Sequence, residues 1–512
     1  MTPAILQTSV WLLLLASCNL VASSASSHSR GESVFAESYD YIIVGGGTSG
    51  LVVANLLSED PTIYNANWYT ETTLVIEHGL IDNSSLTLIP RLGLQYFPNN
   101  VKNWNYVSAP VEALSNATFS VYIADVVGGS SLHNGMFADR GSKANYDAWG
   151  TLTGDDTWSW EGLYPYFINS TTFTPPSEEL QTHFDIRNNA SGYPPVIFPD
   201  YRNQTLAAED FGIEISVAPE SGDAIGFCWV PQTLDPKRGF RSHSRVAYYD
   251  PIASRPNPHL ITGHLVEKIL FDECFGPYTQ GTSPDAAFIP LSQLTSQSQD
   301  IIDQARAQNV SNYLPSIYLN NSALLKGYLA QRDIILDHFS RTDAAVIEIP
   351  IGTTGPGACA VKKPLSRGTI TLSPSSPHSQ PIINYHTFSS PTDSLILTSC
   401  IRYIRFYYSS PHLSSYSPTE NIPGPAARTD EEILAALISA GAIAPSFGHP
   451  SGTCALGKRE LGGCVGKDLL VHGVRKVSVV DASVTPLIPA MHLQLTVYAV
   501  AEKAGDVIKG RA

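Results

Sequence analysis

The sequence predicts a two-domain α/β protein in which one domain is built around a buried parallel sheet. With 512 residues the chain is too long for one small core. An apolar, β-branched run, Tyr41–Val44, leads directly into a glycine-rich turn and a helical pattern. A second such run follows at Thr73–Ile76. Apolar runs of this length, separated by a helix, are typical of parallel strands that are buried on both faces.

The composition excludes some classes of partner. The chain is 43% hydrophobic and 15% charged, which is typical of a folded globular protein. It carries 31 basic and 46 acidic residues, a net charge of −15. Nucleic acids and anionic membranes select for clustered Lys and Arg, so we expect neither as a partner.

The N-terminus predicts a secretory signal peptide over residues 1–27. Val10–Ala16 is a short apolar run, and small residues follow at Ala22–Ser27. The run is too short to span a bilayer. One alternative is that the apolar run forms a buried strand at the start of the fold. The Ser-rich stretch that follows the run favours a signal peptide over this strand. Another alternative is a lipoprotein signal, because Leu15–Cys18 has the form of a bacterial lipoprotein site. We therefore expect a secreted protein, or one in the lumen of the secretory pathway.

Two further features bear on the compartment. Sequons of the form N-x-S/T, which give weak support for glycosylation, occur at Asn83, Asn116, Asn169, Asn189, Asn203, Asn309 and Asn320. Removal of the signal leaves six of the seven cysteines. They form no CxxC pair, so we expect no zinc site. Disulfides are expected, with several pairings open.

The glycine-rich turn Gly45–Gly50 (GGGTSG) predicts a dinucleotide-binding site. Gly45 permits a tight turn, Gly47 lets the backbone approach a pyrophosphate, and Gly50 lets helix and strand pack closely. Thr48 and Ser49 complete the turn, and the following helix offers free N–H groups to phosphates. The alternative is a purely structural glycine turn.

Glu77 ends the second apolar run and is placed to accept hydrogen bonds from ribose hydroxyls. It lies further from Gly50 than the usual spacing of about 20 residues. The intervening Asn65–Tyr69 has the character of a loop insertion that accounts for the excess.

A second motif separates FAD from NAD. Val127–Met136 reads VGGSSLHNGM and is followed by Arg140 and Gly141. Together with Tyr146–Trp149, Trp158–Phe167 and later runs up to Pro364–Thr369, it resembles the glucose–methanol–choline (GMC) oxidoreductases over most of the chain. The resemblance implies an FAD-binding Rossmann-like domain of the glutathione reductase type, with an inserted α+β substrate domain.

The resemblance also implies which residues contact the cofactor. A Gly-Gly-Ser-Ser turn brings backbone amides against flavin and diphosphate where larger side chains would clash. The implied residues are Val127, Gly129, Ser130, His133, Asn134, Gly135, Met136 and Val266, in addition to the first turn and Glu77. Choline oxidase-like members bond the flavin covalently to a histidine at the position of His133. The alternative is a histidine that packs beside the flavin.

The C-terminal region carries the implied catalytic residues. Phe447–Cys454 and Pro489–Leu493 resemble the family's active-site segments, with the spacing of glucose oxidase-like members. His449 is then the base and His492 binds the same substrate oxygen. A neutral imidazole, with an ordinary pKa near 6.5, is suited to accepting a hydroxyl proton. Asp481 is expected to bond flavin or ribityl groups; the alternative is an Asp that caps the next turn.

One family segment is missing. After Asp272 the family normally continues with a strand resembling VILAAGA and a second signature resembling SPxLLxxSGIG, and neither is present. Ile438–Ile443 is similar to that strand, but it comes too late in the chain, and we interpret it as coincidence. We expect the sheet to lack a central strand, with unpaired backbone groups that cost about 1–3 kcal/mol each.

The resemblance implies FAD-dependent oxidation of a primary or secondary alcohol, aryl or derived from secondary metabolism, to an aldehyde or ketone. Dioxygen or another acceptor would reoxidise the flavin. The alternatives are a non-catalytic remnant that binds no cofactor and a hydroxynitrile lyase-like enzyme; an NAD-dependent dehydrogenase fits the motifs least. The expected boundaries are 36–145, 206–272 and 447–512 for the FAD domain and 146–205 and 273–446 for the substrate domain.

Overall fold

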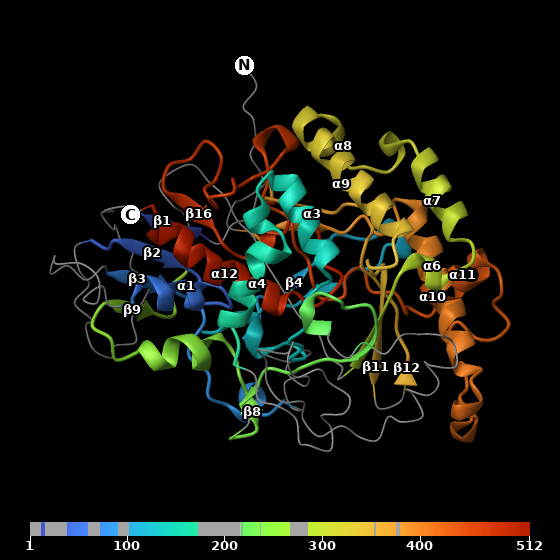
Figure 1. Cartoon of the computed structure of the whole chain (residues 1–512), viewed down its shortest axis with the longest axis horizontal. Coiled ribbons are helices and arrows are strands. Elements are labelled where there is room, and N and C mark those ends of the chain that lie inside the picture. Colours follow the sequence, from blue (N-terminus) through green and yellow to red (C-terminus); the bar gives the residue numbers. More distant parts are fainter. Residues whose placement is uncertain are drawn as a thin grey trace.

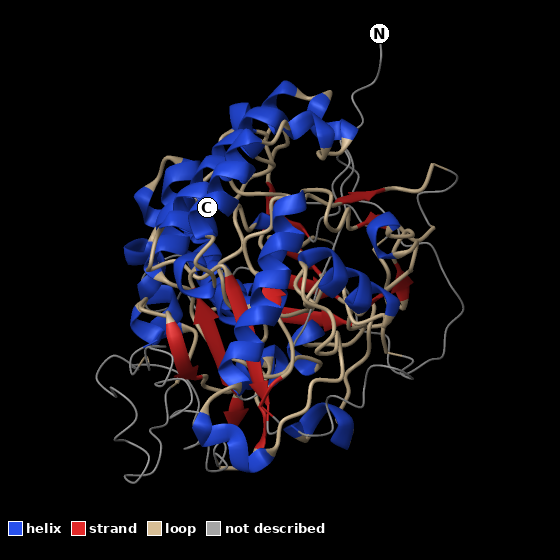
Figure 2. Ribbon diagram, turned by 90° about the vertical axis from the view of Figure 1, so that its right-hand side faces the viewer, coloured by secondary structure: helices blue, strands red, loops and turns tan. Residues whose placement is uncertain are grey.

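The computed structural model describes two sheets surrounded by helices (Figures 1 and 2). The residues it describes are 12–15, 38–59, 72–90, 102–172, 216, 219–235, 237–266, 285–352, 355–374 and 379–511. Their helices are α1 Gly50–Leu57, α2 Ser85–Leu88, α3 Lys143–Thr153, α4 Trp160–Asn169, α6 Leu291–Leu294, α7 Ser298–Ala307, α8 Ser316–Leu319, α9 Ser322–Ser340, α10 Pro391–Tyr408, α11 Asp430–Ser439 and α12 Leu493–Lys509.

The first sheet has five strands in the order β16-β1-β2-β3-β9 and lies at the left of Figure 1. These strands are β1 Leu12–Leu15, β2 Tyr41–Val44, β3 Thr73–Ile76, β9 Pro258–Ile261 and β16 Val477–Val479. β2, β3 and β9 pair in parallel. Every residue of β2 and β3 is buried. The predicted parallel sheet and its first two strands are confirmed.

The position between β2 and β16 is occupied by β1, which comes from the apolar N-terminal run. β1 pairs antiparallel with both neighbours: Leu13 lies opposite Ile43 on one side and Ser478 on the other. The sequence predicts a vacancy in the sheet because a family strand is missing, and the structure fills a central position from the N-terminus instead. The rest of the predicted signal segment, 1–27, lies outside the described residues.

Helices α1 and α12 pack against each other next to this sheet. Gly505 in α12 faces Leu56 so closely that an added Cβ would lie 2.5 Å from Leu56 Cδ1. α12 also packs on α4, and its buried side includes Leu495 and Ala499. His492 directly precedes α12, and both it and the glycine-rich turn before α1 line the same cavity.

The second sheet has the order β12-β11-β10-β6, with β13 also paired to β11, and all its pairs are antiparallel. Its strands are β6 Gly226–Trp229, β10 Asp285–Ile289, β11 Ile347–Gly352, β12 Gly355–Pro356 and β13 Ala360–Val361. β6 comes from the segment 206–272, which the sequence predicts for the FAD domain. Its pairing with β10 places it in the second sheet instead.

Short two-stranded pairs complete the strands of the described chain: β4 Tyr106–Val107 with β5 Ser120–Val121, β7 Leu234–Asp235 with β8 Phe240–Arg241, and β14 Thr369–Thr371 with β15 Ile382–Asn384. Ile438 and Ser439 lie in α11 and Gly441 in the turn after it. The similarity of this region to the missing family strand is therefore coincidental, as the sequence analysis interprets it.

Two disulfides cross-link the chain, Cys359–Cys400 and Cys454–Cys464. The second closes a loop shortly after His449. The sequence predicts disulfides but leaves their pairing open, and the structure assigns these two. Across the part of the chain that is described, none of the helices combines the length and the apolar character that a bilayer crossing requires.

Candidate active site

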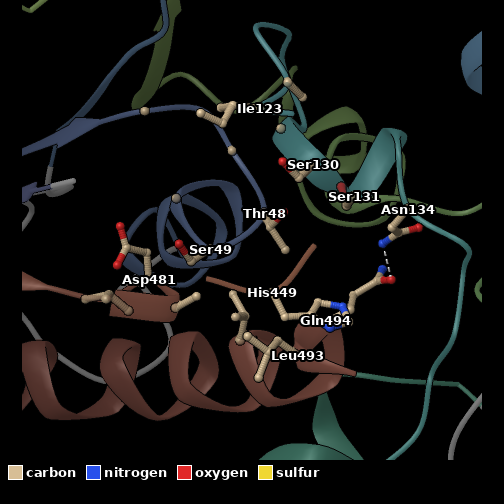
Figure 3. A pocket seen from close by; sticks show the side chains of 18 of the residues that line it. Thr48, Ser49, Ile123, Ser130, Ser131, Asn134, His449, Asp481, Leu493 and Gln494 are labelled. Atoms are coloured by element: carbon tan, nitrogen blue, oxygen red, sulfur yellow. Dashed lines mark hydrogen bonds between the residues drawn. The ribbon is translucent and has the colours of Figure 1, made fainter. Parts of the chain in front are cut away.

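An elongated cavity of about 1290 Å³ lies between the first sheet, the loop after residue 127 and the start of α12. The glycine-rich turn, Ser130–Ser131, Asn134–Gly135, His449 and the region from Val480 to Val497 all contribute to its walls. Figure 3 shows Thr48, Ser130, Asn134, His449 and Asp481 around the same space.

The glycine-rich turn is tight because its first and last residues, Gly45 and Gly50, lack side chains. Gly45 has a φ of 96°, in the left-handed region that favours glycine. A Cβ added at Gly50 would lie 2.0 Å from Gly45 O, which no side chain tolerates. The first turn of α1 is thereby held against the end of β2, and the turn residues Gly47–Gly50 line the cavity at the start of this helix.

A second glycine pair packs directly on this turn. Gly128 N donates to Gly46 O at 2.7 Å, and a Cβ added at Gly129 would lie 2.8 Å from Gly47 Cα. Both Gly128 and Gly129 have positive φ, 105° and 55°. Two backbone segments far apart in the sequence therefore lie in contact, and together they form one wall of the cavity.

Glu77 supports the turn from the side of β3. Its carboxylate accepts from Gly46 N and from Gly79 N, each at 2.7 Å. Burial raises the pKa of Glu77 to about 7, although the two backbone hydrogen bonds act to lower it. Glu77 lines the cavity, as the prediction of a ribose acceptor requires. Through its two hydrogen bonds the Glu77 carboxylate also holds the backbone of Gly46 and Gly79 in place, a role that the sequence does not indicate.

Asn134 connects the glycine wall to α12. Its side-chain amide donates to Gln494 Oε1. The buried Arg241 guanidinium donates to both Asn134 O and Asn134 Oδ1 at 2.7 Å. Gln494 in turn donates to Tyr498 Oη at 3.3 Å. This chain fixes the position of Asn134 at the cavity relative to the helix that begins at Leu493.

The two predicted catalytic histidines lie together at the cavity. The ring centroids of His449 and His492 are 5.3 Å apart and their planes are nearly perpendicular, at 84°. Phe137 stacks on His492 with centroids 4.1 Å apart, and Phe447 lies near both histidines. His449 keeps part of its surface open to the cavity, whereas His492 is 4% exposed.

The pKa values of the two histidines are shifted in opposite directions. Burial lowers the pKa of His449 well below its ordinary value, and the nearby charges of Lys362 and His492 lower it further. Burial also acts to lower the pKa of His492, but Asp139 and Glu348 outweigh it, and the pKa of His492 is raised. Near neutral pH, His449 is therefore an uncharged imidazole that is able to accept a proton.

Most of the predicted site residues line the cavity. These are Gly45, Gly47, Thr48, Ser49, Gly50, Glu77, Gly129, Ser130, Asn134, Gly135, His449, Asp481 and His492. Asp481 also accepts a hydrogen bond from Ser483 N at 2.8 Å, as the alternative interpretation of a capping Asp requires. The position of Asp481 at the cavity and this capping bond are therefore both present in the structure. Four predicted residues do not line the cavity: Val127, His133, Met136 and Val266. Their roles, like those of the lining residues, stay predictions.

Several residues of the site escaped the sequence analysis. Phe137 and Gln494 line the cavity, and Asp139, Glu348 and Lys362 form a buried layer behind His492. Three of these residues lie next to the motifs recognised in the sequence: Phe137, Asp139 and Gln494. Their position beside those motifs is the sequence feature that could have identified them as site residues. Glu348 and Lys362 come from the second sheet, and no local pattern connects them to the histidines.

The site fits FAD in this structure. Side chains would clash at Gly50, Gly128 and Gly129, where the two backbone segments meet, and the start of α1 lines the cavity where its positive dipole end would favour a diphosphate. Ser130 and Asn134 would hold the flavin end, close to the histidines, and Glu77 lies at the end of the cavity formed by β3. The residues expected around the adenine, 267–270, lie outside the described residues.

Comparisons with known proteins agree with this geometry. Two family models described as GMC oxidoreductase match residues 39–308 and 364–501. The dehydrogenase xptC of Emericella nidulans is 26% identical, with 92% of this chain and 93% of that protein covered. The glucose oxidase-like protein fsoC of Humicola fuscoatra is 28% identical, with 95% and 98% covered. The xptC alignment extends over 598 positions, more than the 512 residues of this chain, so that relative has segments that this chain lacks.

Solved structures are similar over almost their whole length. An FAD-dependent oxidoreductase from Chaetomium thermophilum has a TM-score of 0.82 and 28% identity, with 92% of this chain and 99% of that chain covered. A fungal aryl-alcohol oxidase has a TM-score of 0.81 and 27% identity over the same shares. The Rossmann-like α/β fold is thereby confirmed, and so is the resemblance on which the sequence analysis relies.

The glycine turn can be tested by Gly50→Ala. Its methyl group would overlap Gly45 O, and overpacking of this kind costs about 1–3 kcal/mol. If that cost falls on cofactor binding, FAD affinity drops by about ten- to a hundredfold. Titration of protein freed of flavin, followed by quenching of FAD fluorescence, measures it. The control is Gly357→Ala, since an added Cβ there meets nothing within 4 Å. Equal affinities in both variants would contradict the role of the turn.

Proposed function

The chain belongs to the GMC oxidoreductase family, and on this basis we propose that it oxidises an aryl or secondary-metabolite alcohol, primary or secondary, to an aldehyde or ketone. The observation that carries the proposal is the pair of adjacent histidines at one end of a cavity that fits FAD. The similarity to a fungal aryl-alcohol oxidase supports an aromatic alcohol. Phe137, which lines the cavity beside His492, also favours an aromatic substrate.

The residues divide the chemistry between them. Bound FAD would supply the oxidising power by taking a hydride from the carbinol carbon. His449 accepts the hydroxyl proton, since its lowered pKa keeps the ring uncharged. His492 lies next to it and stabilises the negative charge that develops on the oxygen. Phe137 and Phe447 exclude water from this end of the cavity. Dioxygen or another acceptor would be the final electron acceptor.

The cofactor is tested first, by the visible absorbance spectrum of the purified protein before and after acid precipitation. We expect flavin bands, which would exclude a non-catalytic remnant without cofactor. Flavin released into the acid supernatant means that the cofactor is not covalently bound. Flavin retained in the pellet supports a covalent bond at His133, and loss of that retention in His133→Ala would assign the bond. Absence of flavin bands, even after refolding with FAD, would overturn the proposal.

The base is tested by His449→Ala. Loss of a positioned general base lowers rates by about 10²–10⁴-fold. The rate is that of flavin bleaching when a benzylic alcohol is mixed with the protein under anaerobic conditions. His472→Ala is the matched control, because this histidine bonds Gly457 O and does not line the cavity. Equal rates in the two variants would contradict a base role. Turnover of a cyanohydrin without any bleaching of the wild-type flavin would favour the lyase-like alternative.

We also propose that the protein enters the secretory pathway. Two disulfides support this, because they persist in oxidising compartments. The described sequon asparagines, Asn83, Asn116, Asn169, Asn309 and Asn320, are all exposed.

Expression with the native N-terminus in a fungal host tests this localisation. We expect protein in the medium that begins near residue 28 and loses mass on treatment with an N-glycosidase. Retention in the cell, with residue 1 or 2 as the N-terminus and no glycan, would contradict the proposal.

A further inference from the structure

The buried groups around His492 define its charge. Its Nδ1 lies 2.8 Å from Asp139 Oδ2, and its Nε2 lies 3.3 Å from Glu348 Oε1. Asp139 is 1% exposed and Glu348 is fully buried. Each of the two ring nitrogens therefore faces a carboxyl group away from solvent.

This geometry restricts where the protons lie. A neutral imidazole has one N–H donor and one acceptor nitrogen, whereas an imidazolium has two donors. The ring nitrogen Nδ1 hydrogen-bonds Asp139, whereas the 3.3 Å approach of Nε2 to Glu348 Oε1 is an ion-pair distance without a hydrogen bond. With both carboxyl groups ionised, an imidazolium is attracted to both of them. A neutral His492 would leave the second carboxylate without that attraction, unless Glu348 were itself protonated.

The position of Lys362 favours the imidazolium form of His492 over a neutral His492 with a protonated Glu348. Its ammonium group pairs with Glu348 Oε2, the oxygen that does not face His492, and the lysine is 5% exposed. A cation at this position favours the ionised form of Glu348. The proton of the pair then resides on His492.

Charge balance supports the same assignment. Asp139 and Glu348 carry two negative charges, and Lys362 supplies one positive charge. An uncompensated charge in the interior is costly, and an imidazolium at His492 brings this cluster to neutrality. The neighbouring Arg140 and Glu220 pair with each other, with Nε and Oε2 3.3 Å apart. His449 is the remaining titratable group that faces His492, and Phe137 and Phe447 cover its other sides.

We infer that Asp139, Glu348 and Lys362 are positioning residues that keep His492 as an imidazolium, so that His492 does not act as a second base beside His449. The raised pKa of His492 agrees with this geometry. The consequence for catalysis rests on the proposed function, whereas the charge state of His492 does not. One histidine accepts the proton, and the other already carries one.

The inference is tested through the pH dependence of stability. A raised pKa in the folded state makes the stabilisation by His492 complete below its unfolded pKa, and this stabilisation is lost as pH rises through the folded pKa. The wild-type urea midpoint should therefore fall between about pH 6 and about pH 9, the range above the ordinary histidine pKa. Glu77, Glu220 and Lys363, with pKa values of about 7, 8 and 7, also titrate there, so only differences between variants are interpreted.

The variants are Asp139→Asn and Glu348→Gln, each alone and combined with His492→Gln, measured on the protein as isolated. Asp139→Asn keeps the hydrogen-bond acceptor and removes the charge. We expect it to reduce the fall of the midpoint with pH by at least half, and to have no such effect once His492 is replaced. Asp139→Glu should restore the fall. Asp393→Asn is the control: it removes another buried carboxylate, which bonds Leu365 N and Ser366 N, and should lower the midpoint similarly at both pH values.

Equal pH dependence in the wild type, Asp139→Asn and His492→Gln would overturn the inference, because His492 would then be uncharged throughout. If Asp139→Asn does not fold, the same comparison with Glu348→Gln decides. In protein that holds flavin, the pH at which the bound-flavin spectrum changes should also move down by about 1–3 units in Asp139→Asn, since that is the effect of losing a close opposite charge. A flavin-free protein with the expected urea series would defeat the proposed function and leave this inference intact.

Discussion

The contact between the Gly45–Gly50 turn and Gly128–Gly129 is the constraint on which the site depends. No side chain fits at Gly50, where an added Cβ would overlap Gly45 O, or at Gly129, which has a positive φ and whose added Cβ would lie 2.8 Å from Gly47 Cα. The turn extends from β2, and the loop after Gly129 carries Asn134 and Asp139. Asn134 in turn contacts Gln494 in α12. One close backbone approach thereby sets the positions of residues that are hundreds of positions apart in sequence.

The charge layer behind His492 joins the two halves of the molecule. Asp139 belongs to the cofactor side, whereas Glu348 lies in β11 of the second sheet and Lys362 directly follows β13. Both carboxylates reach the same imidazole, so the opposite pKa shifts of His449 and His492 arise only when the halves are docked. Two like side chains 5.3 Å apart thus acquire different chemistry from their surroundings.

The sequence predicted what local pattern encodes. β2, β3, the start of α1 and thirteen of the seventeen predicted site residues, those that line the cavity, follow from contiguous motifs. Glu348 and Lys362 could not be identified in this way. Glu348 is an acidic residue in an apolar strand, and Lys362 follows a short strand. Neither pattern indicates which residues these side chains contact in the folded chain. His133 belongs to a recognised motif, yet it is fully buried and is not among the residues that line the cavity. A motif specifies the path of the backbone more closely than the direction of each side chain.

The N-terminal run shows how one local pattern can serve two uses. Four consecutive leucines satisfy both a signal peptide and a buried strand, and β1 lies where β2 and β16 would otherwise have open edges. Cleavage near residue 28 would remove β1 and leave those backbone groups without a partner, at a cost of about 1–3 kcal/mol for each one that stays buried. Retention of β1 would keep the sheet continuous without the segment that longer relatives carry. The N-terminus of the mature protein therefore determines how this shortened family member completes its sheet.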